Sequence, residues 1–356
     1  MKKIVLLLIS ISLLHGTPVS THAQEGYALN LVGRLNTGIT YDVHVEGNNA
    51  YLTNNQGVDI LDISDISNPR KISTIRIQDG AFGIYVKDGV AYIAGETGLT
   101  ITDVSDPEHP ETLGSFYDGG VNRNVRIQGS YAYVTDYEDG LEIVDISDLS
   151  NPVMVGRYSL GDARGVEVVG DIAYVTSPGT GLRVLNISNP ADPKIIRSVP
   201  GTGSAGSICV HDDRIYLGCY GQGARIVSIT DPLNPRVVGD FSAGIREASG
   251  IYGDVDLLFV VDQTSGGDVI LLDVSDPEAP QELARYTNLN AHDVFYDGNF
   301  GYIATVSRGM FILEYGPEGA GSSPSGWNYT LPLIALSILA AVLIVYRVFR
   351  RSSIRP

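Results

Sequence analysis

The chain has 356 residues, with 24 lysines and arginines against 41 aspartates and glutamates, and a formal net charge of −17. Six of the basic residues lie in segments 1–23 and 327–356, whereas every acidic residue lies between 24 and 326, so this middle segment carries a net charge of −23. Such an acidic surface repels nucleic acid, and two cysteines are too few for a disulfide scaffold, so both of these classes are excluded.

Residues 1–23 are typical of a secretory signal peptide. Lys2 and Lys3 precede an uncharged run over residues 4–14, and a polar stretch ends at Ala23 in front of Gln24. This order of basic, apolar and polar segments marks a signal that is removed on export. An uncleaved N-terminal anchor is the alternative, but the apolar run is shorter than a membrane span. We therefore expect the chain from residue 24 onward to be exported.

Residues 24–315 contain one unit repeated seven times. In each of the first six units a proline follows the repeated segment, and successive prolines are 41, 42, 41, 42 and 45 residues apart. Each unit holds four short runs rich in Val, Ile, Tyr and Leu, bounded by Gly, Asn, Asp and Pro. Four strands in roughly 42 residues, seven times over, predict an all-β fold, a seven-bladed β-propeller. A sandwich needs no such strict period, and the coils of a β-solenoid, the rival fold, are usually shorter.

The ends of the repeat region predict how the ring closes. A spare strand over residues 30–35 precedes the first unit, and the last unit, at residues 309–315, stops without an outer strand. We expect the spare strand to complete the seventh blade, because this pairing removes two open sheet edges at once.

The repeat is clearest at residues 141–152, which read Leu-Glu-Ile-Val-Asp-Ile-Ser-Asp-Leu-Ser-Asn-Pro. This pattern resembles the LVIVD-repeat proteins, and the resemblance covers residues 30–315. It implies a surface-exposed β-propeller, in a family whose ligands are mostly unknown. The fifth unit departs from the pattern with Ser228 where Asp recurs, and the sixth carries one extra residue.

Residues that recur in most units are interpreted as structural. Asp and Ser beside a tight turn bond their own backbone, and calcium binding is the weaker alternative, because the ligand spacing of a calcium loop is missing. One tyrosine per blade suits the core between blades better than an aromatic binding array. The acids are Asp62, Asp103, Asp145 and Asp273, each two residues before a serine, and the tyrosines are Tyr51, Tyr92, Tyr133, Tyr174, Tyr216 and Tyr302.

The two cysteines lie on adjacent predicted strands that are joined by a turn near Asp212. The register expected from this turn pairs Cys209 with Tyr216 and not with Cys219, which argues against a disulfide. We expect two buried free thiols.

Residues that break the repeat point to the functional site, because loops held by a rigid scaffold carry most binding sites. The loops that enter the inner strands surround one mouth of the central channel and differ from blade to blade. Their arginines could hold a carboxylate or an acidic sugar, since guanidinium groups match such oxygens. The alternative is that these arginines pair across the channel with Asp42, Glu247 or Asp293. The candidate ligand-binding residues are Tyr41, Asp42, Arg123, Asn124, Arg164, Arg246, Glu247, His292 and Asp293.

The C-terminal segment is expected to anchor the chain. Residues 316–326 have the composition of a short flexible stalk, and residues 327–346 carry no charge over 20 positions. That length spans a bilayer, and the arginines within residues 347–356 place the tail in the cytoplasm. We therefore expect a single-pass cell-membrane protein with its propeller outside.

The sequence favours a cell-surface binding or adhesion module, with an extracellular ligand or protein partner and a monomeric propeller. An exported lyase or hydrolase that uses the channel mouth is one alternative, and a structural surface-layer component is another. Neither a nucleophile motif nor a metal-binding motif is present, so we expect no catalytic residue, no metal and no cofactor.

Overall fold

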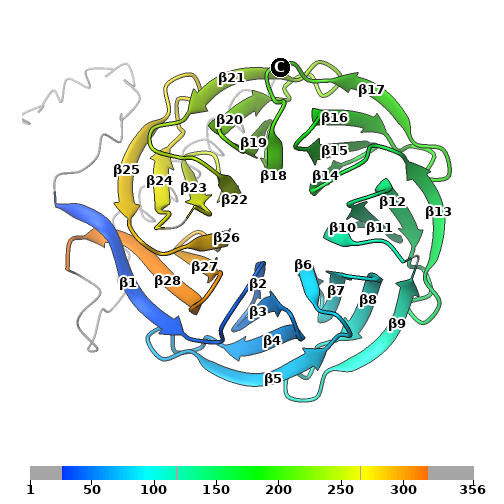
Figure 1. The fold of residues 1–356 in the computed structure, drawn as a ribbon, viewed down its shortest axis with the longest axis horizontal. Coiled ribbons are helices and arrows are strands. Elements are labelled where there is room, and N and C mark those ends of the chain that lie inside the picture. The colour runs from blue at the N-terminus through cyan, green and yellow to red at the C-terminus, as the bar shows by residue number, and fades with distance from the viewer. Residues whose placement is uncertain (1–25, 118, 265, 320–356) are drawn as a thin grey trace, which may run out of the picture. The chain divides into compact units, whose positions relative to one another are not determined.

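The computed structural model describes residues 26–117, 119–264 and 266–319. Seven four-stranded antiparallel sheets are arranged as blades around a central channel (Figure 1). The expected signal peptide, the membrane helix, the cytoplasmic tail and most of the stalk lie outside the described residues. Within the described ranges, no helix is long and apolar enough to cross a membrane.

Each blade runs from an inner strand at the channel to an outer strand on the outside of the ring. The inner strands are β2 (Val43–Glu46), β6 (Ala81–Lys87), β10 (Asn122–Gln128), β14 (Gly165–Val169), β18 (Ala205–His211), β22 (Ala248–Gly253) and β26 (Ala291–Tyr296). The second strands are β3 (Asn49–Asn54), β7 (Val90–Gly95), β11 (Tyr131–Asp136), β15 (Ile172–Ser177), β19 (Arg214–Cys219), β23 (Leu257–Asp262) and β27 (Phe300–Thr305).

The third strands are β4 (Gly57–Asp62), β8 (Gly98–Asp103), β12 (Gly140–Asp145), β16 (Gly181–Asn186), β20 (Gly223–Ser228), β24 (Val269–Asp273) and β28 (Gly309–Pro317). The outer strands are β5 (Arg70–Arg76), β9 (Glu111–Tyr117), β13 (Val153–Tyr158), β17 (Lys194–Ser198), β21 (Arg236–Phe241), β25 (Gln281–Tyr286) and β1 (Tyr27–Leu35). The predicted seven-bladed propeller is thus confirmed.

The ring closes through β1, as the spare strand predicted. β1 pairs antiparallel with β28, from Tyr27 opposite Pro317 to Leu35 opposite Met310, so the seventh blade joins the two ends of the propeller. β28 runs two residues further than the expected end of the propeller at residue 315, because Gly316 and Pro317 still have partners on β1.

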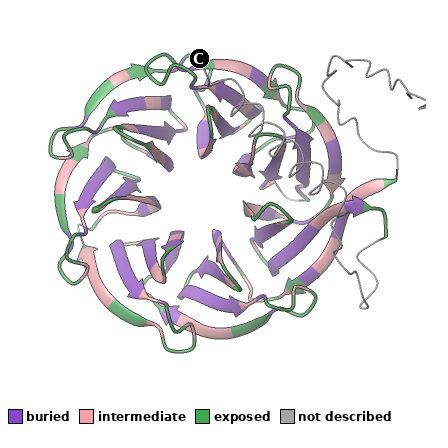
Figure 2. Cartoon of the chain, turned by 180° about the vertical axis from the view of Figure 1, so that it is seen from behind, coloured by how far each residue is buried: buried purple, intermediate pink, exposed green. Residues whose placement is uncertain are grey.

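The core is divided into seven hydrophobic clusters, and each cluster joins two neighbouring blades. The recurring tyrosines lie in these clusters, and Tyr51 and Tyr302 are each 1% exposed. Figure 2 shows the burial concentrated on the middle strands, while the outer strands are partly exposed. Packing between blades therefore stabilises the ring, and the interpretation of the tyrosines as core residues is correct.

The recurring turns also follow the prediction. In four blades the Asp carboxylate accepts a hydrogen bond from the backbone N–H two residues later, as Asp62 Oδ1 does from Ser64 at 2.9 Å. Cys209 lies opposite Tyr216 in the β18–β19 register, and both cysteines are buried and free. Burial raises the pKa of the Cys209 thiol to about 12, which makes it unreactive.

Neighbouring blades also meet through backbone contacts at their outer strands. A Cβ atom placed on Gly156 of β13 would lie 2.0 Å from the Pro190 carbonyl oxygen in the next blade. Gly239 of β21 approaches the Pro277 carbonyl oxygen in the same way, at 1.8 Å. Only glycine allows these approaches, so a glycine at this position of the outer strand helps to set the spacing between blades.

Candidate functional site

The mouth of the channel holds a cavity of about 580 Å³ that is lined by residues from all seven inner strands or the loops before them. In five blades the inner strand has a register shift at its first residues, which marks a β-bulge. Bulges re-aim neighbouring side chains, so they help to set the direction of the residues at the mouth. The rim positions, one per blade, are Tyr41, Phe82, Arg123, Arg164, Gly206, Ser249 and His292.

Three neighbouring rim positions are aromatic. The ring centre of Tyr41 lies 5.5 Å from that of Phe82 and 5.6 Å from that of His292. His292 donates its Nδ1–H to the Tyr41 carbonyl oxygen at 2.7 Å, because a carbonyl can only accept. Burial lowers the pKa of His292, so this imidazole is neutral. One side of the rim is therefore an uncharged aromatic wall.

Arg123 lies next to Phe82 at the rim and has no carboxylate partner among the described residues. Its Cζ atom lies 4.6 Å from the ring centre of Phe82 and 5.4 Å from that of Tyr137. Its Nε atom is buried and makes no hydrogen bond. Burial, together with the neighbouring Arg164, lowers the pKa of Arg123. The rim thus presents a half-buried cation with unused hydrogen-bonding capacity.

Arg164 is held by an acid of its own loop. Its Nε and Nη2 atoms donate to the two carboxylate oxygens of Asp162 at 2.7 and 3.0 Å. No described arginine of the expected site pairs with Asp42, Glu247 or Asp293. Arg164 therefore forms no ion pair across the channel, because its own loop supplies a nearer carboxylate.

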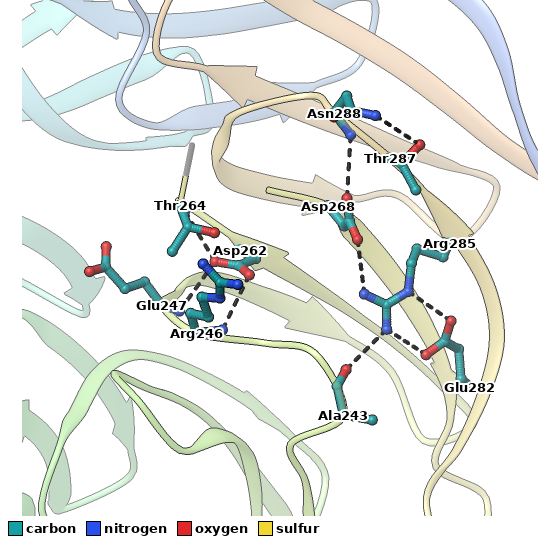
Figure 3. Close-up of polar contacts among 10 residues, drawn as sticks. All are labelled: Ala243, Arg246, Glu247, Asp262, Thr264, Asp268, Glu282, Arg285, Thr287 and Asn288. Atoms are coloured by element: carbon teal, nitrogen blue, oxygen red, sulfur yellow. Dashed lines mark hydrogen bonds and ion pairs between the residues drawn. The ribbon is translucent and has the colours of Figure 1, made fainter. Parts of the chain in front are cut away.

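Arg246 and Glu247 do not line the cavity, in contrast to the prediction. Both are exposed, and their backbone N–H groups donate to the buried carboxylate of Asp262, each at 3.2 Å (Figure 3). The same carboxylate accepts from the Thr264 N–H at 3.1 Å. Asp262 thus fixes the loop before β22, and these two residues lie outside the cavity lining.

Asp42 and Asp293 are brought together at the joint between blades 7, 1 and 2. Asp42 accepts hydrogen bonds from the N–H groups of Val43 at 2.7 Å and of Ile84 at 2.8 Å. Burial, followed by the charge of Asp42 and a hydrogen bond to it, raises the pKa of Asp293 well above its usual value. The fold therefore favours the protonated form of Asp293, and Asp42 links the first blade to the second through the Ile84 N–H.

A second tier of channel residues was missed by the sequence analysis. These residues lie three positions beyond the rim on each inner strand, so continuing the alignment of the blades along the strand would have found them. All but Cys209 are half-buried, and all seven line the cavity. They are His44, Tyr85, Arg126, Glu167, Cys209, Tyr252 and Phe295.

Four neighbours of this inner tier form an aromatic arc. The ring centre of His44 lies 5.2 Å from that of Tyr85 and 5.0 Å from that of Phe295, and Phe295 lies 4.8 Å from Tyr252. Burial and the nearby Arg126 lower the pKa of His44 to about 3, so its ring is neutral. The arc covers the three blades that carry the aromatic rim and extends to the sixth blade through Tyr252.

The inner tier is charged on the other side. Arg126 Nε donates to Glu167 Oε1 at 2.9 Å, and Arg126 Nη1 donates to the Val125 carbonyl oxygen at 2.9 Å. Burial raises the pKa of Glu167, while Arg126 opposes this shift, and the carboxylate in turn keeps Arg126 protonated. The channel wall is thus aromatic on one side and a hydrogen-bonded ion pair on the other.

The described residues contain no group of three or more His, Cys, Asp or Glu side chains that could hold a metal ion. The structure brings seven of the nine predicted site residues to the cavity: Tyr41, Asp42, Arg123, Asn124, Arg164, His292 and Asp293. What the arrangement offers is an unpaired cation beside aromatic rings, which suits the binding of an anion.

Comparison with known proteins supports the fold and the family. The crystal structure of the computationally designed Ika8 protein is similar, with a TM-score of 0.60, 7% identity, and coverage of 80% of this chain and 99% of that one. The β-propeller domain of Cps50 (Swd1) from Myceliophteria thermophila has a TM-score of 0.67, 11% identity and the same coverage. No curated protein matches the chain. The family model of the LVIVD repeat matches residues 37–75, 80–118, 119–159 and 160–200. Four LVIVD repeats are therefore present within residues 37–200, which confirms the sequence resemblance over this part of the chain.

Proposed function

We propose that this chain is a cell-surface binding module that takes an anionic ligand at the mouth of its channel. Arg123 carries the proposal: a half-buried guanidinium with a buried, unpaired Nε, in a cavity of the size that small ligands occupy. Arg123 has no carboxylate partner among the described residues, so a ligand carboxylate at its guanidinium would form charge-assisted hydrogen bonds that no side chain of the chain supplies. The rigid ring holds this donor in place before any ligand arrives, which reduces the entropy that binding costs.

The location is part of the same proposal and is supported by the two ends of the sequence. Residues 1–23 have the order of a signal peptide, and residues 327–346 form an uncharged run that is followed by arginines. A propeller on the outer side of the membrane would present its channel to ligands in the surroundings.

An enzymatic role has less support. Asp42 and Asp293 are hydrogen-bonded to each other, and Asp42 also accepts two backbone hydrogen bonds. The arrangement therefore suits a link between blades better than acid–base chemistry.

The test is a binding screen of small monocarboxylates against the full chain in detergent, with the rise of the melting temperature as the first readout and calorimetry as the second. Arg123→Gln should weaken binding roughly 10- to 150-fold, which corresponds to about 1.5–3 kcal/mol, and added salt should weaken binding by the intact chain. Arg236→Gln, at an exposed arginine of the outer strand β21, is the matched control.

Two results would contradict the proposal. One is that no carboxylate shifts the melting temperature, and the other is that Arg123→Gln binds as well as Arg236→Gln. On intact cells, protease added from outside should destroy the binding; binding that survives this treatment would argue against the location.

A further inference from the structure

We infer that the anionic group is carried by a sugar ring, so that the ligand is a short glycan ending in a uronic acid. This inference rests on the proposed function and deepens it, because it uses the inner tier of the channel to choose among carboxylates. The aromatic arc, the ion pair opposite it and the acidic surface outside the channel each bear on the choice.

The aromatic arc supplies a surface for a ring. Its four members are tilted against each other by 41° to 61° rather than stacked, and all four line the cavity. Aromatic faces carry partial negative charge, and the C–H groups on the face of a sugar carry partial positive charge, so the two surfaces attract each other. The arc lies below the rim, where a ring attached to the carboxylate at Arg123 would extend.

The opposite wall distinguishes a sugar from a purely aromatic acid. Arg126 and Glu167 are joined by one hydrogen bond, and Arg164 and Asp162 are joined by two at the rim, so each guanidinium keeps further N–H donors. An apolar ring would remove water from these groups and give nothing in return, which is costly for charged atoms. Sugar hydroxyls both donate and accept, so they can bond to such guanidinium–carboxylate pairs.

The surface charge limits the length of the ligand. The segment 24–326 carries a net charge of −23, so its field repels a long polyanion as it approaches. A single terminal carboxylate meets Arg123 within a local positive region and avoids most of this repulsion. A chain end with one uronate therefore fits better than an internal stretch of a uniformly charged polysaccharide.

The experiment compares four probes on the full chain by calorimetry: a uronate-terminated disaccharide, its neutral counterpart, benzoate and acetate. We expect the uronate disaccharide to bind most tightly. Phe295→Leu removes one ring of the arc, and this ring contacts no guanidinium. The change should weaken binding of the uronate disaccharide about three- to tenfold while leaving binding of acetate unchanged. Tyr252→Leu is a second variant with the same expectation, and Tyr117→Leu, at a residue that is 65% exposed, is the control.

The outcomes separate the inference from the proposed function. The inference of a sugar ligand is wrong if benzoate binds as tightly as the uronate disaccharide, or if Phe295→Leu and Tyr252→Leu weaken the binding of all anions equally. The proposed anion binding is unaffected by either result. If none of the three anions binds, both the sugar inference and the proposed function are wrong. If the neutral disaccharide binds as well as the uronate, the sugar surface is present but the role of Arg123 is wrong.

Discussion

Because β1 closes the ring, we expect the loss of one buried leucine side chain on this strand to destabilise the whole propeller. Leu29 is 5% exposed and lies in a cluster with Phe259 and Leu283 of the sixth blade and Leu313 of β28. It therefore connects β1 both to its own blade and to the next. A buried leucine changed to alanine costs about 2–5 kcal/mol, so Leu29→Ala should lower the melting temperature by roughly 4–20 °C.

The assay is thermal unfolding of the full chain followed by circular dichroism and by tyrosine fluorescence. Leu233→Ala makes the same chemical change at a side chain that is 54% exposed, and its effect should stay within about 0.5 kcal/mol. If Leu29→Ala behaves like this control, β1 does not hold the ring closed. If only a small early transition appears and the main one is unchanged, β1 detaches alone, and the claim that it supports the whole ring is wrong.

Two further changes test the contacts between blades. Gly156→Ala should destabilise the fold by about 1–3 kcal/mol, measured by urea unfolding, because its Cβ would lie 2.0 Å from the Pro190 oxygen, whereas Gly179→Ala, with no atom within 4 Å, should be nearly neutral. Because the pKa of Asp293 is raised in the fold, the native state binds more protons than the unfolded state, so stability should fall as the pH rises from the usual carboxyl range through this raised pKa. Asp293→Asn should flatten this dependence, and an unchanged slope would contradict the raised pKa of Asp293.

Most of the fold could be predicted because each repeat solves the same physical problem. A tyrosine such as Tyr174 recurs because every blade needs a large side chain in the cluster that it shares with its neighbour, and it is fully buried in the structure. An acid such as Asp145 recurs because every blade turns at the same place, and it bonds the Ser147 N–H as expected. A periodic sequence therefore shows the same structural pattern several times, and each repeat supports the prediction from the others.

The site could be predicted only in part, because it depends on how loops fold. The sequence placed Arg164 at the rim but could not show that Asp162, two residues earlier, would turn back to bind it. It placed Arg246 at the mouth as well, yet the carboxylate of Asp262, on a different strand, fixes that loop so that Arg246 lies outside the cavity lining. Such partners follow from three-dimensional proximity and not from spacing along one strand.

The positions directly after the rim show which departures from the repeat concern the ligand and which concern the ring. A Cβ atom placed on Gly83 would lie 2.4 Å from the Arg123 carbonyl oxygen, and one on Gly250 would lie 2.6 Å from the Asp293 Cα atom. Side chains at this position therefore lie against the next blade, at the edge of the cavity. Asp42 fits this pattern, because it bonds the N–H of the next inner strand. The acid pair at the mouth thus belongs to the joint between blades. We assign ligand choice to the rim and to the inner tier, where the side chains line the cavity and vary around the ring.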